Sequence, residues 1–194
     1  MTTTTNDIQP QRKRIHPHKF TMWVAMGSII MMFAGLTSAY LVKRAQANWQ
    51  AFDLPVLFSY STAVIVASSI TIQLALKNYK QRHMAVYRQL MLVTAVLGIV
   101  FIALQFAGFT DLNQRGIRLL GAGSNVAGSF LAVIAGLHML HVLGGIIALL
   151  VMLFLAFRGS RRVYSAVPVE VAATYWHFVD ALWIYLFVFL QMVS

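Results

Sequence analysis

Five long stretches of the chain are almost free of charged residues. They cover residues 20–42, 54–76, 89–110, 119–157 and 171–194, and the last contains a single charge, Asp180. A helix of about 20 apolar residues crosses a hydrocarbon core about 30 Å thick, so four of these stretches have the length of one crossing each. Lipid cannot hydrogen-bond an open backbone, and no strand-like alternation is present. The pattern therefore predicts transmembrane helices.

The fourth stretch is too short for two crossings with a turn between them. It opens with residues typical of a loop, namely Gly121, Gly123, Ser124 and Asn125, so one long helix is expected to follow. The fold class is thus an all-α polytopic membrane bundle with five helices, at about 20–42, 55–76, 89–110, 126–157 and 171–193. These form a single domain, residues 20–194, preceded by an N-terminal tail at 1–19.

Lysine and arginine residues divide unevenly between the two sides of this arrangement. Eleven lie in the tail or in the loops after the second and fourth helices, and four lie on the other side: Lys43, Arg44, Arg115 and Arg118. The positive-inside rule then places the tail and N-terminus in the cytoplasm and the C-terminus in the periplasm. The net charge of +10 is interpreted as a topology signal. No nucleic-acid partner is expected, because the basic residues lie in short loops against a membrane.

Composition excludes several classes of protein. The chain is 59% hydrophobic and 10% charged, which is unlike a water-soluble domain or a disordered segment. The absence of cysteine excludes a disulfide scaffold, a Cys-ligated zinc site and an iron–sulfur centre. No phosphate-binding loop or nucleophile triad is found. Trp23, Tyr164, Tyr175 and Trp176 fall near expected helix ends and are interpreted as interfacial anchors.

Four ionisable residues lie inside the expected helices: His138, His141, His177 and Asp180. Each pair is spaced i, i+3 and shares one helical face. At about 1.5 Å per residue, His141 lies about 20 Å past Val126 and Asp180 about 13 Å past Val171. Because the two helices run in opposite directions through a core about 30 Å thick, both residues lie at a similar depth, and a His–Asp contact between the helices is hypothesised. Three interpretations stay open: interhelical hydrogen bonding, a proton relay, and a metal or haem site. The first is favoured, since the first three helices offer no acidic residue for a relay and no further metal ligands are evident.

Two motifs in the last two helices resemble the heme–copper oxidase subunit III family, which includes cytochrome c oxidase subunit III and its quinol-oxidase counterpart. Residues 136–145 read GLHMLHVLGG, and residues 170–185 read EVAATYWHFVDALWIY. They match the family patterns G-x-H-x-x-H-V-x-x-G and E-x-A-A-x-Y-W-H-F-V-D-x-x-W. The matching positions are Gly136, His138, His141, Val142, Gly145, Glu170, Ala172, Ala173, Tyr175, Trp176, His177, Phe178, Val179, Asp180 and Trp183.

The first helix is also similar to the family, and the resemblance spans residues 20–192. Two departures stand out. Ile29 occupies a position where the family usually has a buried Glu, and Gly108 occupies one where an acidic residue usually follows the family's Gln, here Gln105. Five helices are typical of a short bacterial member that lacks the first two helices of longer relatives. In those relatives a lipid-filled cleft lies between the first two helices and the others.

The resemblance implies a non-catalytic subunit III of a bacterial aa3- or caa3-type cytochrome c oxidase in the inner membrane. It implies that this chain holds no cofactor, that haem and copper lie in partner subunits, and that phospholipid binds. The expected partners are subunits I and II, with further small subunits or a respiratory supercomplex. The implied role is to stabilise subunit I and to support proton uptake and dioxygen access.

Two alternatives remain open at this point. One is subunit III of a quinol oxidase, or an accessory subunit of a nitric-oxide reductase. The other is a free-standing small transporter or haem-binding membrane protein.

Overall fold

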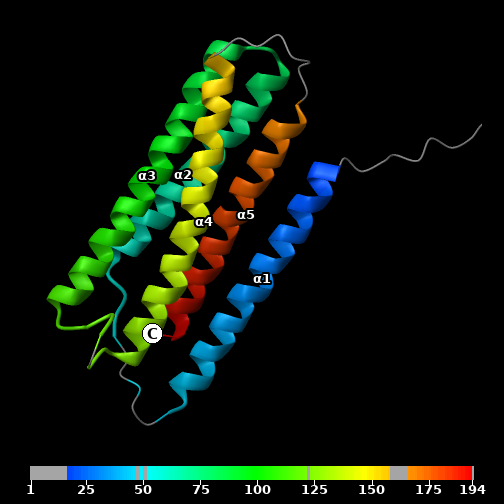
Figure 1. Cartoon of the computed structure of the whole chain (residues 1–194). Helices are drawn as coiled ribbons and strands as arrows, with labels where there is room; N and C mark the ends of the chain where they lie inside the picture. The colour runs from blue at the N-terminus through cyan, green and yellow to red at the C-terminus, as the bar shows by residue number, and fades with distance from the viewer. Residues whose placement is uncertain (1–16, 47–48, 50–51, 122, 158–165, 194) are drawn as a thin grey trace, which may run out of the picture.

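The computed structural model describes residues 17–46, 49, 52–121, 123–157 and 166–193. All regular structure in these residues is helical. The helices are α1 (Pro17–Arg44), α2 (Val56–Lys80), α3 (Met84–Gln114), α4 (Val126–Phe157) and α5 (Val167–Val193). Each is long and apolar enough to cross a membrane, so the prediction of five spanning helices is confirmed. All five run along one long axis (Figure 1).

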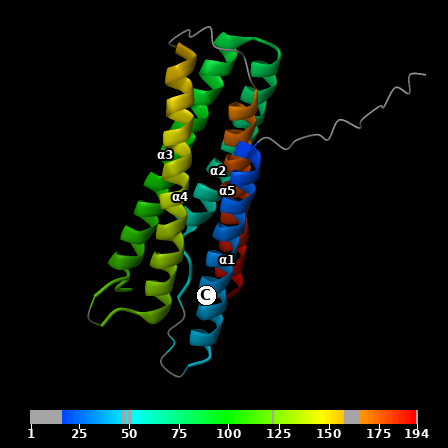
Figure 2. The ribbon, with the colours of Figure 1, turned by 45° about the vertical axis from the view of Figure 1, so that its right-hand side comes forward.

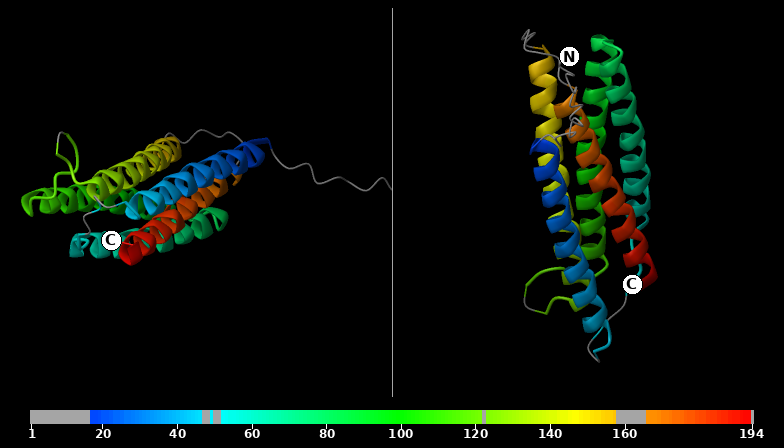
Figure 3. Two further views of the ribbon diagram at one scale, coloured as in Figure 1. Left: turned by 90° about the horizontal axis from the view of Figure 1, so that it is seen from below. Right: turned by 90° about the vertical axis from the view of Figure 1, so that its right-hand side faces the viewer.

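Several predicted features fall outside the described residues. Residues 1–16 of the expected tail, Tyr164, and the basic residues Arg158, Arg161 and Arg162 all belong to this group. The start of α1 and the end of α5 lie at opposite ends of the long axis (Figure 3), as an odd number of crossings requires.

Four of the helices extend beyond the charge-free stretches from which they were predicted, and α4 has the predicted bounds. α1 continues through Lys43 and Arg44, and α2 continues through Lys77 and Lys80. Long basic side chains can lie along apolar surface while their charged groups reach the aqueous interface, so they do not end a helix where the hydrocarbon ends. The connection between α2 and α3 is only residues 81–83, and Arg82 turns the chain with a φ of 62°, in the left-handed region.

Helices α2 to α5 form a four-helix bundle in which each packs on the next and α5 closes the ring against α2. α1 lies outside this ring and packs against α4 and α5 (Figure 2). Among the described residues, α1 has no packing contact with α2 or α3. The first helix of the chain is therefore a peripheral element of the fold.

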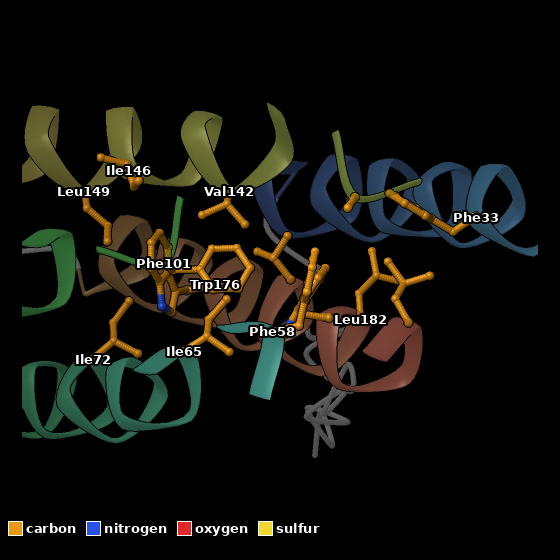
Figure 4. Close-up of a cluster of buried hydrophobic side chains, with 14 of the residues drawn as sticks. Phe33, Phe58, Ile65, Ile72, Phe101, Val142, Ile146, Leu149, Trp176 and Leu182 are labelled. Carbon is orange, nitrogen blue, oxygen red and sulfur yellow. The ribbon is translucent and has the colours of Figure 1, made fainter. Parts of the chain in front are cut away.

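Large aromatic side chains fill the centre of the ring. Phe58, Phe101, Trp176 and Trp183 are each at most 1% exposed, and Figure 4 shows Trp176 lying among Phe101, Ile65, Ile72 and Ile146. The outer faces of the helices carry exposed apolar side chains, including Met31, Leu140 and Phe154. This distribution suits a bundle whose outside faces lipid or another membrane protein.

Candidate functional site

Hydrogen bonds between side chains join α5 to α2. Trp176 Nε1 donates a hydrogen bond to Ser68 Oγ at 3.0 Å, and Trp183 Nε1 donates to Thr62 Oγ1 at 2.9 Å. Both hydroxyls also donate to carbonyl oxygens of their own helix, Ser68 to Ile65 and Thr62 to Phe58. Each hydroxyl thus donates a hydrogen bond within α2 and accepts one from an indole of α5.

Trp176 is a core residue and not an interfacial anchor, so that prediction was wrong. Its ring is 1% exposed, and it lies between two glycines of neighbouring helices. A Cβ on Gly98 of α3 would come within 2.8 Å of the ring, and a Cβ on Gly145 of α4 within 3.0 Å. The prediction failed because α5 begins at Val167, one turn earlier than expected, which moves Trp176 deeper into the bundle.

His177 lies at the outer edge of the α2–α5 contact. Its Nδ1 is 2.6 Å from Ser69 Oγ, and its Nε2 is 3.1 Å from Gln73 Oε1. Because the Gln73 carbonyl oxygen can only accept, the imidazole donates from Nε2 and accepts the Ser69 hydroxyl proton at Nδ1. His177 is half-buried, while Gln73 is exposed.

Asp180 lies one turn further along α5 and is 3% exposed. Ser69 is near enough to interact with its carboxyl group. The tautomer of His177 assigns the single hydroxyl proton of Ser69 to His177. Neither carboxyl oxygen of Asp180 has a hydrogen-bond partner in the described part of the chain. The two residues predicted to share a face of α5 therefore meet the same serine of α2.

His138 and His141 lie on α4, on the other side of α5. His138 is fully buried, and neither of its ring nitrogens has a hydrogen-bond partner among the residues that the structure describes. Its ring packs against those of Trp183, Phe101 and Phe33, with centroid distances of 5.1, 5.8 and 6.3 Å. His141 is half-buried and bonds the Leu137 carbonyl of its own helix through Nδ1 at 2.7 Å.

The hypothesised His–Asp contact between α4 and α5 is not formed. Asp180 faces α2 through Ser69, whereas the ring of Trp183, one turn later on α5, packs against His138. Matching depths along two helices place residues at the same level, but the rotation of each helix decides which side chains meet. The direct link between the motifs is instead Tyr175, whose hydroxyl donates to the His141 carbonyl at 3.1 Å.

Glu170 joins three helices at the end of the bundle where α5 begins. Its two carboxylate oxygens lie 3.0 Å from Lys19 Nζ of α1 and 2.9 Å from Lys80 Nζ of α2. A carboxylate in the first turn of a helix also interacts favourably with the helix dipole. The ion pairs are partly exposed, so they locate the charged level of this end and add modest stability.

The remaining motif residues serve packing. Val142 is buried in the core and Phe178 packs at its margin. Gly145 lies against the ring of Trp176, whereas a Cβ on Gly136 would meet no atom within 4 Å. Of the two motif glycines, only Gly145 is required for a close approach.

The two departures from the family pattern both lie against packed side chains. Ile29 is half-buried against the hydrophobic core. A Cβ on Gly108 would lie 2.8 Å from the ring of Phe58, which occupies the space that an acidic side chain would need. Gln105, one turn earlier, is fully buried and donates to Ser61 Oγ at 2.9 Å.

An apolar groove of about 530 Å³ opens between α1, α4 and α5. It is lined by Met22 from α1, by Gly145, Ala148, Val151 and Met152 from α4, and by Val167, Pro168, Val171, Ala172 and Tyr175 from α5. In the described part of the chain, no group of three His, Asp or Glu side chains is arranged to hold a metal ion.

Fold and site together define a polytopic membrane protein whose intramembrane polar side chains largely join one helix to the next. A family model described as cytochrome c oxidase subunit III matches residues 43–194. The chain belongs to the cytochrome c oxidase subunit III family, as the motifs of α4 and α5 predicted.

Individual relatives cover nearly the whole chain. A probable cytochrome c oxidase subunit 3 of Nocardia farcinica is 32% identical over 192 residues, which is 93% of each chain. The cytochrome c oxidase subunit 3 of Corynebacterium diphtheriae is 29% identical and covers 88% of each chain. That of Bacillus sp. strain PS3 is 26% identical and covers 89% of this chain and 84% of its own.

Proposed function

We propose that this chain is the non-catalytic subunit III of a bacterial aa3- or caa3-type cytochrome c oxidase. It resides in the inner membrane with its N-terminus in the cytoplasm, and it assembles with subunits I and II, which hold the haem and copper. Its role is to stabilise subunit I during turnover and to support proton uptake and dioxygen access. The family match over almost the entire chain carries this proposal.

The side-chain chemistry of the bundle supports a structural role. The indoles of α5 and the hydroxyls of α2 are engaged in helix–helix hydrogen bonds, and His138 is enclosed by aromatic rings. Such groups give a rigid bundle with a defined surface, which is what a supporting subunit offers to its neighbour.

Deletion of this subunit tests the role. Oxygen consumption should begin at a substantial rate in the remaining complex and then decay over many turnovers faster than in the wild type. Retention of the wild-type decay rate would contradict a stabilising role. A complete loss of initial activity in an otherwise intact, haem-loaded complex would contradict a non-catalytic one. A Soret band from the purified chain alone would favour a haem-binding protein instead.

The groove between α1, α4 and α5 is the proposed phospholipid site. Its lining is almost entirely apolar, and Lys19 lies one helical turn before Met22, at the level of Glu170. An acyl chain of the phospholipid would occupy the groove while the phosphate of the same lipid reaches Lys19. Ala148→Phe should fill the groove and lower the phospholipid retained on purification, whereas Leu143→Phe, on the exposed face of the same helix, should not. Equal lipid retention in both variants would reject this site.

A further inference from the structure

The outer face of the α2–α5 contact carries a hydrogen-bonded polar patch made of Ser69, Gln73 and His177. The distance of this patch from the charged end of the bundle places it inside the hydrocarbon core. His177 is seven residues past Glu170, and Gln73 is seven residues before Lys80, so each lies about 10 Å from the charged level at about 1.5 Å per residue. Residues at that depth are beyond the reach of lipid headgroups in a core about 30 Å thick.

The patch has more hydrogen-bonding capacity than this chain uses. Within the described residues, the Gln73 side chain bonds His177 through Oε1 only, which leaves its amide NH₂ group free. Behind the patch, both carboxyl oxygens of the buried Asp180 are without a partner. Polar groups left unsatisfied in hydrocarbon are costly, and intramembrane ionisable side chains usually face a bundle interior or a partner.

The surrounding surface suits the approach of another helix. Along α5 the exposed or half-exposed stripe on either side of His177 includes Thr174 and Ala181, both small, and then Ile184. Small residues let two helices approach closely in a membrane. α1 packs on α4 and α5 and has no contact with α2, so no helix in the described part of the chain covers the α2 side of this face.

We infer that the patch of Ser69, Gln73 and His177 docks a transmembrane helix of the haem-bearing oxidase subunit, and that this helix presents a hydroxyl or amide side chain at the patch. Such a side chain can accept a hydrogen bond from the Gln73 amide and donate one to an oxygen of the patch. The apolar residues around it, among them Val66 and Ile184, form the dry margin of the contact. The inference rests on the proposed function, since it takes its partner from that assembly.

Association with the haem-bearing subunit tests the docking surface. In the full complex, tagged wild-type chain is expected to retain haem absorbance on purification. The double variant Gln73→Leu/His177→Leu should retain at least tenfold less, because apolar side chains cannot satisfy the partner's polar group. Gln89→Leu is the matched control, since it makes the same change on the exposed surface of α3, and it should bind as the wild type does.

Photocrosslinking keeps the test independent of folding. A benzophenone side chain at Val66 or Ile184 should crosslink to the haem-bearing subunit in membranes. One at Leu92 or Val96 on α3, which are at least as exposed, should not. Crosslinks from Val66 and Ile184 only to lipid, or to a second copy of this chain, would overturn the inference. Full haem retention by the double variant would do the same and leave the proposed function intact. A wild-type chain that retains no haem would instead defeat the proposed function.

Discussion

Replacement of Gly98 by alanine should destabilise the bundle through the ring of Trp176. The new Cβ would lie 2.8 Å from Cη2 of Trp176 and 3.0 Å from Cγ1 of Ile146, whereas carbon atoms prefer about 3.5 to 4.0 Å. The ring cannot retreat easily, because Gly145 also approaches its six-membered ring and its Nε1 is bonded to Ser68 at 3.0 Å. Overpacking of this kind costs about 1–3 kcal/mol.

Alanine also gains about 1 kcal/mol over glycine from helix propensity, which would partly conceal the clash. Gly144→Ala provides the control, because a Cβ there meets no atom within 4 Å and the same propensity gain applies. The difference in unfolding free energy between Gly98→Ala and Gly144→Ala should therefore be about 1–3 kcal/mol, the cost of the clash itself.

Unfolding by SDS in mixed micelles, followed by far-UV circular dichroism, measures this difference for the purified chain. Trp176→Phe provides a second check, since the smaller ring leaves room for the new methyl group. Combined with Gly98→Ala it should lose much less stability than the sum of the two single changes. Equal stability of the Gly98 and Gly144 variants, or strict additivity with Trp176→Phe, would refute the reasoning.

Three further outcomes follow from the site. Glu170→Gln should cost at most about 1 kcal/mol, since its two ion pairs are partly exposed, and the loss should shrink with added salt in thermal unfolding. Gly108→Asp should cost more than about 2 kcal/mol and Gly108→Ala less, because the aspartate adds a buried charge to the contact with Phe58; comparable melting temperatures would contradict this. Asp180→Asn should change the stability of the isolated chain by less than about 1 kcal/mol, because no described residue bonds the carboxyl and the amide that replaces it would be equally unpaired; a marked drop in melting temperature would reveal a hydrogen bond that the structure lacks.

The fold could be predicted well from the sequence because charge marks the limits of hydrocarbon. Each run with at most one charged residue contains a helix long and apolar enough to span a membrane, and the glycine-rich start of the fourth run correctly indicated a loop. The ends of the helices were less predictable. A lysine such as Lys80 is compatible with both a helix and a loop, and here it remains helical so that its ammonium group can reach Glu170.

The polar contacts were harder to predict. Side chains such as Ser68 and Thr62 are common in membrane helices and carry no charge, so nothing marked them as partners of Trp176 and Trp183. The concentration of serine and threonine residues in 54–76, higher than in any other spanning stretch, was the one available signal. The side of α5 on which Asp180 lies depended on the rotation of that helix. The burial of Trp176 and Trp183 determines this rotation, and depth alone does not.

The position of α1 outside the ring has a consequence for biosynthesis. This helix precedes its partners α4 and α5 in the chain, so it waits in lipid while α2 and α3 are inserted. Its buried hydroxyl, Thr37, bonds the Phe33 carbonyl of its own helix at 3.0 Å. A helix that satisfies its own polar groups can wait alone, and the order of synthesis then imposes no penalty on assembly.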